Sequence, residues 1–176
     1  MDYLDTRSLL VPGTRVDLLD NRLVLIVPAA STSTLRIAPN FALAAALGTD
    51  RLAMANPDSV PAGKYGKAAL TALGVWASVE RKIARTENVR AALSAGGARR
   101  SPVRHRLRDR RSRRARGPRA RCVPASTHPP IVYPIAVIAA SRLPAAARAL
   151  VAYLASDTAR AMWQRYGFAP IARTSP

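Results

Sequence analysis

Apolar residues gather in short runs separated by turn signals, and the spacing within the runs predicts secondary structure. Residues 22–27 are almost wholly aliphatic and of strand length, which predicts a buried strand in a mostly parallel sheet. Residues 51–55 form a second short strand before the turn signal Asn56-Pro57-Asp58. Residues 131–138 form a third strand, in which Pro134 indicates an irregular point or a sheet edge.

Helical spacing predominates between these strands. Residues 61–73 predict a helix that begins at Pro61 and has Gly74 just beyond its end, the usual placement of proline and glycine at helix ends. Further helical segments are expected at residues 2–10, 41–47, 77–84, 87–93 and 144–166. Strands that alternate with helices indicate an α/β fold.

Length and composition narrow the class of protein. With 176 residues and 49% hydrophobic residues the chain can bury a sizeable core, so global disorder is not expected. No apolar run reaches the roughly 18 residues of a membrane span. The acidic start at Met1-Asp2 is not that of a signal peptide. The single cysteine, Cys122, excludes an internal disulfide framework and a zinc site built on cysteines.

Positive charge is concentrated in one tract. Arg99 to Arg121 holds twelve arginines and one acidic residue, Asp109, and therefore carries +11 of the formal net charge of +18. The tract has no lysine and no aromatic residue, and shows neither helical nor strand periodicity. We therefore expect residues 95–122 to be irregular or disordered. Binding of nucleic acid or another polyanion through residues 99–121 is the alternative function that this charge suggests.

Catalytic chemistry has little support in the sequence. No nucleophile-elbow motif is present. The stretch Gly63–Lys67 lacks the first glycine of a phosphate-binding loop, and Ala68 replaces its Ser/Thr. His128 has no second histidine or cysteine at metal-ligand spacing. We therefore expect a binding protein, with no catalytic residue and no enzymatic activity.

Two predicted helix starts could bind an oxyanion. Pro61 fixes φ and Gly63 allows close backbone approach, so the amides near Ala62 would point outward from a positive helix end. A second helix start follows Thr86 or Asn88 as cap and leaves early amides that include that of Val89. Every helix has such an end, so ordinary capping without a ligand remains the alternative.

Several segments resemble, in family order, the periplasmic molybdate-binding proteins, which are the substrate-binding components of molybdate ABC transporters. The similarity covers residues 1 to about 93 and about 123 to 172. The segments that carry it are Met1-Asp2-Tyr3-Leu4, Asn21-Arg22-Leu23-Val24, Arg51-Leu52-Ala53-Met54-Ala55-Asn56-Pro57, Val60-Pro61-Ala62-Gly63-Lys64-Tyr65-Gly66-Lys67, Glu87-Asn88-Val89-Arg90, His128-Pro129-Pro130-Ile131-Val132-Tyr133-Pro134 and Arg165-Tyr166-Gly167-Phe168.

The resemblance implies a two-lobed periplasmic binding protein fold of type II that closes on a tetrahedral oxyanion. It implies that backbone amides at Ala62 and Val89 hydrogen-bond molybdate or tungstate, with no direct side-chain ligation of the metal and no cofactor. The implied partner is an ABC transporter permease in the membrane, the implied location is the periplasm, and the protein would be a monomer that binds no nucleic acid. Residues 1–22 and 131–176 would belong to the first lobe, and residues 23–130 to the second.

This sequence departs from the family at two places. Met1 matches an internal methionine of the family, so we expect most of the first lobe, with its serine ligands and export signal, to be missing, and the chain to be cytoplasmic if translated as written. Leu107 stands where the family has a ligand tyrosine at the end of an aliphatic strand, so the second lobe would contain one disrupted strand. We therefore expect this chain to bind molybdate poorly or not at all.

The arginine tract also suggests a translation error. Codons chosen for Arg100 to Arg108 yield Glu-Val-Arg-Phe-Gly-Ile-Val-Tyr when read one nucleotide later, which restores the missing strand. An arginine-rich, lysine-free product is what a GC-rich gene gives in a wrong frame. The hypothesis is that residues at about 95–122 are frameshifted, and the nucleotide sequence of the gene tests it.

Overall fold

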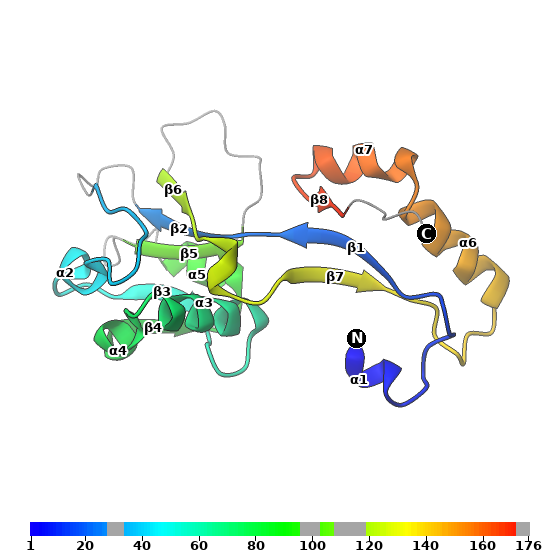
Figure 1. The fold of residues 1–176 in the computed structure, drawn as a ribbon, viewed down its shortest axis with the longest axis horizontal. Coiled ribbons are helices and arrows are strands. Elements are labelled where there is room, and N and C mark those ends of the chain that lie inside the picture. The colour runs from blue at the N-terminus through cyan, green and yellow to red at the C-terminus, as the bar shows by residue number, and fades with distance from the viewer. Residues whose placement is uncertain (28–33, 96–102, 108–118, 172–176) are drawn as a thin grey trace. The chain divides into compact units, whose positions relative to one another are not determined.

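The chain forms two compact units, each with its own sheet (Figure 1). The computed structural model describes residues 1–27, 34–95, 103–107 and 119–171, and side chains outside 103–107 and 119. Within the described residues, unit 1 comprises residues 1–21 and 131–171, and unit 2 comprises residues 22–107 and 119–130. The chain thus passes from one unit to the other between Asn21 and Arg22 and again between Pro130 and Ile131.

Unit 2 is built on a five-stranded mixed sheet with the strand order β4-β3-β5-β2-β6. Its strands are β2 (Leu23–Val27), β3 (Leu52–Ala55), β4 (Ile83–Thr86), β5 (Val103–Leu107) and β6 (Arg119–Cys122). Strand β3 runs parallel to β4 and β5, whereas β2 is antiparallel to β5 and β6. The expectation of a mostly parallel sheet around residues 22–27 is therefore wrong, because both neighbours of β2 run against it.

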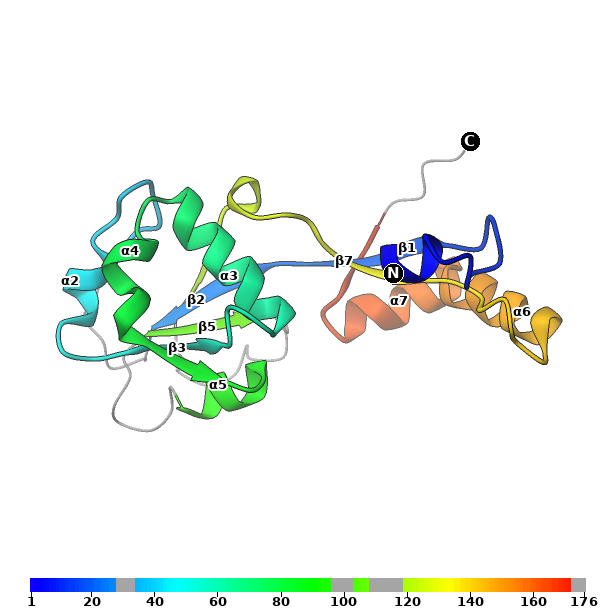
Figure 2. The same cartoon turned by 90° about the horizontal axis from the view of Figure 1, so that it is seen from below.

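Helices cover both faces of this sheet (Figure 2). Helix α3 (Pro61–Ala72) lies on one face, and α5 (Val89–Ala95) lies on the other. The short α4 (Trp76–Val79) contacts α3, and α2 (Leu43–Leu47) contacts α4. The 3-10 turns of unit 2 are Glu80–Lys82 and Ala125–Thr127.

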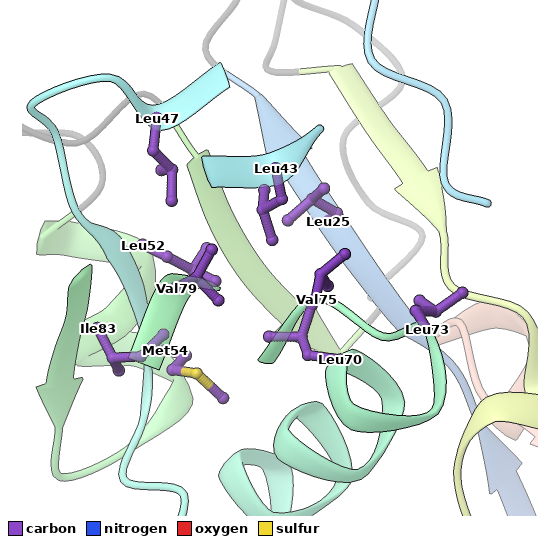
Figure 3. Packing of buried hydrophobic residues seen from close by; sticks show 10 residues of the cluster. All are labelled: Leu25, Leu43, Leu47, Leu52, Met54, Leu70, Leu73, Val75, Val79 and Ile83. Atoms are coloured by element: carbon purple, nitrogen blue, oxygen red, sulfur yellow. The ribbon is translucent and has the colours of Figure 1, made fainter. Parts of the chain in front are cut away.

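One hydrophobic cluster joins β2, β3 and β4 of unit 2 to α2, α3 and α4 (Figure 3). Its members are 7% exposed or less: Leu25, Leu43, Leu47, Leu52, Met54, Leu70, Leu73, Val75, Val79 and Ile83. The partly buried Trp76 packs against this cluster. Burial of each such aliphatic side chain contributes about 1.5–3 kcal/mol, so this cluster holds unit 2 together.

Unit 1 has a three-stranded antiparallel sheet with the order β7-β1-β8. Its strands are β1 (Val16–Asn21), β7 (Ile131–Ile135) and β8 (Ala169–Pro170), and its helices are α1 (Asp2–Asp5), α6 (Pro144–Leu154) and α7 (Asp157–Arg165). Pro134 lies in the edge strand β7, opposite the register shift between Asp17 and Leu19, which confirms the expected irregular edge position.

The structure differs from the sequence expectations at three further elements. Residues 83 and 84, the end of the segment 77–84 expected to be helical, belong to β4, because the parallel ladder with β3 outweighs a weak helical pattern. The helical region at 144–166 divides into α6 and α7, since Ser156 caps α7 through a hydrogen bond from Ala159 N–H to its Oγ. Strand β1 was not expected, because its Asp17, Asp20 and Asn21 interrupt the apolar pattern.

Part of the arginine tract is regular, contrary to the expectation for residues 95–122. Residues 103–107 form β5 between β3 and β2, and residues 119–122 form β6 at the sheet edge. Backbone hydrogen bonds form whatever the side chains are. The backbone N–H and C=O groups of β2 and β3 can therefore pair with a strand of arginines that lies between them. Residues 96–102 and 108–118 lie outside the described residues.

In the described part of the chain, no helix is both long enough and apolar enough to cross a membrane.

Candidate functional site

The loop between β3 and α3 is fixed by backbone hydrogen bonds. Asn56 N–H donates to the Thr86 carbonyl at 2.8 Å, which joins this loop to the end of β4. The Asn56 side-chain oxygen accepts from Asp58 N–H at 3.0 Å, and the Asn56 carbonyl accepts from Val60 N–H at 3.0 Å. These bonds form a compact turn that determines where α3 begins.

Gly63 allows α3 to begin directly against the end of β3. A Cβ at this position would lie 2.3 Å from the Ala55 carbonyl oxygen and 2.3 Å from that of Asn56. Both neighbours are backbone atoms, which cannot move aside as a side chain can. This confirms the expected close backbone approach at Gly63 and shows that the helix start is packed against the strand end.

The start of α3 leaves two amides ahead of the helical ladder. Val60 is extended at the N-cap and its side chain makes no cap hydrogen bond. Pro61 has no N–H, and the first helical hydrogen bond runs from Lys64 N–H to the Val60 carbonyl at 3.0 Å. The amides of Ala62 and Gly63 therefore have no intrahelical acceptor, and they carry the positive end of the helix dipole.

The start of α5 also leaves two amides ahead of the helical ladder. The Asn88 side-chain oxygen accepts from Ala91 N–H at 2.9 Å, and its carbonyl accepts from Ala92 N–H at 3.1 Å. Asn88, rather than Thr86, is therefore the cap, and the amides of Val89 and Arg90 precede the ladder. The Thr86 hydroxyl instead donates toward the carbonyls of Met54 and Asn88, at 3.2 and 3.0 Å.

Both helix starts follow the carboxyl ends of neighbouring parallel strands. Ala55 of β3 pairs with Thr86 of β4 in the parallel ladder. Strand β5 also runs parallel to β3, so its last residue, Leu107, lies toward the same end of the sheet. Ligands of open α/β sheets bind outside the carboxyl ends of the strands, which is where these amides lie.

Asp58 is the acidic group in the β3–α3 loop, and two cations neutralise it. It forms ion pairs with Arg85 of β4 and with Lys67 of α3, whose Nζ lies 3.3 Å from Oδ1. The hydrogen bond from Arg85, followed by that from Lys67, holds the pKa of the Asp58 carboxyl below its ordinary value of 3.8. The loop is thereby tied to both neighbouring elements without an unbalanced negative charge beside the helix starts.

A pH-dependent contribution to stability follows from the lowered pKa of Asp58. The ion pairs stabilise the folded state at neutral pH, and this contribution falls as the pH drops below 3.8 through the lower folded-state pKa. Urea unfolding of the wild type and Asp58→Asn should therefore differ at pH 7 and converge in acid. In an Arg85→Gln background the difference at pH 7 should shrink, and an unchanged difference there would contradict the assigned pairing.

The other polar candidates are not gathered into a site. His128 Nδ1 lies 2.8 Å from the Pro129 carbonyl, and its ring makes an edge contact with Tyr65. Cys122 is a free, exposed thiol in β6. Across the described ranges, no group of three or more His, Cys, Asp or Glu residues is arranged to hold a metal ion.

Most of the chain matches a known family. A model of the bacterial extracellular solute-binding proteins matches residues 1–169. The chain belongs to this family. Its identity is 33% over 171 residues to the molybdate-binding protein ModA of Haemophilus influenzae, covering 96% of this chain and 66% of that protein. It is 32% identical over 172 residues to ModA of Escherichia coli, with 96% and 65% coverage.

Solved structures agree with this assignment. A substrate-binding domain of Clostridium difficile, assigned to a molybdenum ABC transporter, is 27% identical with a TM-score of 0.72, and the match covers 98% of this chain and 73% of that one. The periplasmic molybdate-binding protein of Azotobacter vinelandii shares the fold, with a TM-score of 0.75 at 21% identity and coverage of 98% and 74%. The expected α/β periplasmic binding protein fold and the family resemblance are thus confirmed.

The match covers part of the length of each curated relative. The chain spans between 56% and 66% of the length of the curated relatives that it matches. These relatives are solute-binding proteins rather than enzymes, and none of them supports the nucleic-acid alternative suggested by residues 99–121.

Proposed function

We propose that this chain binds molybdate, or the similar tungstate, as part of the substrate-binding component of an ABC transporter. The proposed contacts are backbone amides at Ala62 and Val89. The observation that carries the proposal is that two helix starts follow adjacent parallel strands in a protein whose relatives are named molybdate-binding.

Main-chain amides suit a small dianion for a physical reason. Oriented N–H groups at helix starts offer partial positive charge without the desolvation of a full countercharge, and hydrogen bonds to a charged acceptor are short and strong. With Asp58 neutralised by Arg85 and Lys67, its carboxylate does not oppose an approaching anion with a full charge. The size of the oxyanion then determines which oxyanion binds best, because the positions of rigid backbone donors fix the dimensions of the binding site.

The affinity of this chain alone should be low. Hydrogen bonds to a charged group contribute about 1.5–3 kcal/mol each, so contacts at two amide positions give about 3–6 kcal/mol. This corresponds to a Kd between tens of micromolar and several millimolar. Leu107 lies toward the same end of the sheet and adds no hydroxyl donor where the family resemblance implies a tyrosine.

The wider role follows the family. We propose that the solute is delivered to a permease in the membrane from the periplasmic side, that the protein acts as a monomer, and that neither a cofactor nor a catalytic step is involved. We further propose that the two units correspond to the two lobes of a binding protein. Two relatives are named molybdate-binding proteins, and the Azotobacter vinelandii protein is described as periplasmic, which supports this role.

Removal of one amide tests the proposed contact. Val89→Pro deletes the N–H at the first position of α5, where proline is readily accommodated, and Asn88 as cap is compatible with a following proline. We expect molybdate binding, measured by NMR titration, to weaken about 10-fold to 150-fold, the equivalent of one hydrogen bond to a charged acceptor.

Val89→Ala is the matched control, since it shortens the same side chain but keeps the amide. It should bind molybdate as the wild type does, and circular dichroism should show equal helix content in both variants. Equal affinities of Val89→Pro and Val89→Ala would exclude this amide from the site.

A further inference from the structure

Thr86, the last residue of β4, contacts the segments that lead into α3 and α5. Its carbonyl accepts a hydrogen bond from Asn56 N–H at 2.8 Å, in the loop before α3. Its hydroxyl lies 3.2 Å from the Met54 carbonyl oxygen and 3.0 Å from that of Asn88, the cap of α5. A hydroxyl has one proton, which it can donate to either carbonyl. The half-buried Thr86 side chain therefore joins β3 to the start of α5.

The contact with Asn88 bears directly on the proposed oxyanion donor. The Asn88 carbonyl and the Val89 N–H belong to one peptide unit, which is planar. The described residues contain no cis peptide bond, so this N–H points opposite to the carbonyl. A group that fixes the direction of the Asn88 carbonyl therefore also fixes the direction in which Val89 offers its proton.

Two hydrogen bonds hold the Asn88 carbonyl, and they come from different elements. One is donated by Ala92 N–H at 3.1 Å, within α5, so it moves with the helix. The other is donated by Thr86 of β4, which pairs with β3 in the parallel ladder. A carbonyl oxygen has two lone pairs and can accept both bonds at once. Of the two bonds, the one from Thr86 ties the peptide to the sheet.

The start of α3 is held by a different means. Gly63 packs against the carbonyls of Ala55 and Asn56, with no room for a Cβ, and the N-cap residue Val60 makes no side-chain cap hydrogen bond. The Ala62 N–H is thus placed by steric fit against the end of β3. It provides an internal reference when the Thr86 hydroxyl is removed.

We propose that Thr86 is a positioning residue for oxyanion binding, whose hydroxyl orients the Asn88–Val89 peptide so that the Val89 N–H points toward the anion. This role rests on the proposed function, in which the Val89 amide is a donor. A hydrogen bond accepted by a carbonyl also polarises its peptide, which strengthens the N–H of that peptide as a donor. Thr86 acts through Val89 and needs no contact of its own with the anion.

Removal of the hydroxyl tests this role without any anion. Thr86→Val keeps the branched shape that suits a strand, whereas Thr86→Ser keeps the hydroxyl. We expect residual dipolar couplings of the ¹⁵N-labelled chain to show a reoriented Val89 N–H in Thr86→Val, with the Ala62 N–H unchanged. Thr86→Ser should give the wild-type couplings. Thr86→Ala also lacks the hydroxyl and should repeat the result of Thr86→Val, so the test does not depend on the folding of one variant.

Titration with sodium molybdate then measures the consequence for binding. Thr86→Val should weaken binding about threefold to tenfold, which is part of the contribution of one hydrogen bond to a charged acceptor. Thr86→Ser should bind as the wild type does. At saturation, the amide shift of Val89 should be smaller in Thr86→Val than in the wild type, and that of Ala62 should be the same in both.

The outcomes distinguish this proposal from the proposed function. A wild type that binds no molybdate would contradict the proposed function, and the couplings measured without anion would still decide the role of Thr86. An unchanged Val89 N–H orientation in Thr86→Val would overturn that role. An equal reorientation in Thr86→Ser would do the same, because it would assign the effect to the methyl group instead of the hydroxyl.

Discussion

Gly63→Ala is expected to destabilise unit 2 by about 2–3 kcal/mol and to abolish oxyanion binding. In an ordinary helix the same change stabilises by about 0.5–1 kcal/mol. Here the new Cβ would lie 2.3 Å from the carbonyl oxygens of Ala55 and Asn56, so the start of α3 must move away from the end of β3. That movement displaces the amides of Ala62 and residue 63 that the proposed site requires.

Urea unfolding followed by tryptophan fluorescence measures this effect, because Trp76 packs against the core of unit 2. Thr71→Ala is the control: Thr71 is exposed near the other end of α3, so its free energy of unfolding should change by no more than about 0.5 kcal/mol. A Gly63→Ala protein as stable as the wild type would show that α3 is not seated against β3 as described.

The second large effect concerns β5. Replacement of Arg104, His105 and Arg106 by Val, Ile and Val is expected to raise the free energy of unfolding of unit 2 by about 3 kcal/mol or more. Strand β5 pairs with β3 and with β2, and every residue of these two neighbours is buried. Aliphatic residues suit a strand at such a place in a sheet, whereas charged residues there cost desolvation energy.

The double variant Arg104→Lys/Arg106→Lys is the matched control, because it alters the same strand but keeps its charge. It should show no gain in urea unfolding. If the aliphatic variant were no more stable than the lysine variant, β5 would not occupy a covered position in the sheet. A gain would agree with the frameshift hypothesis, in which an aliphatic strand is the original sequence at this place.

Elements with strong local signals could be predicted from the sequence. Helix α3 has proline at its first position and Gly74 with a φ of 71° beyond its end, and both signals act locally. Strand β2 is aliphatic throughout and buried throughout. In these segments local preference and tertiary packing favour the same structure.

Elements whose structure depends on a distant partner could not be predicted. Strand β4 has one buried residue, Ile83, and becomes a strand through its ladder with β3. Strand β5 has no apolar alternation and is held from both sides by β2 and β3. Strand β1 carries Asp17 and Asp20 and buries Leu19 alone among its six residues, so its pattern is not that of a core strand.

In the candidate site, too, features with local sequence signals could be predicted and features that depend on distant partners could not. Helix starts and the close approach at Gly63 could be read from the sequence, because proline, glycine and cap residues have local meanings. The role of Arg85 could not, since its ion pair with Asp58 requires β4, which the sequence did not reveal. The assignment of Ala62 and Val89 as ligands is still a proposal.

An NMR titration of the ¹⁵N-labelled chain with sodium molybdate tests the central claim most directly. The account predicts saturable shifts that are largest at the amides of Ala62, Gly63, Val89 and Arg90 and that follow one common Kd. Shifts confined to the arginine tract between Arg99 and Arg121, with these four amides unmoved, would contradict it.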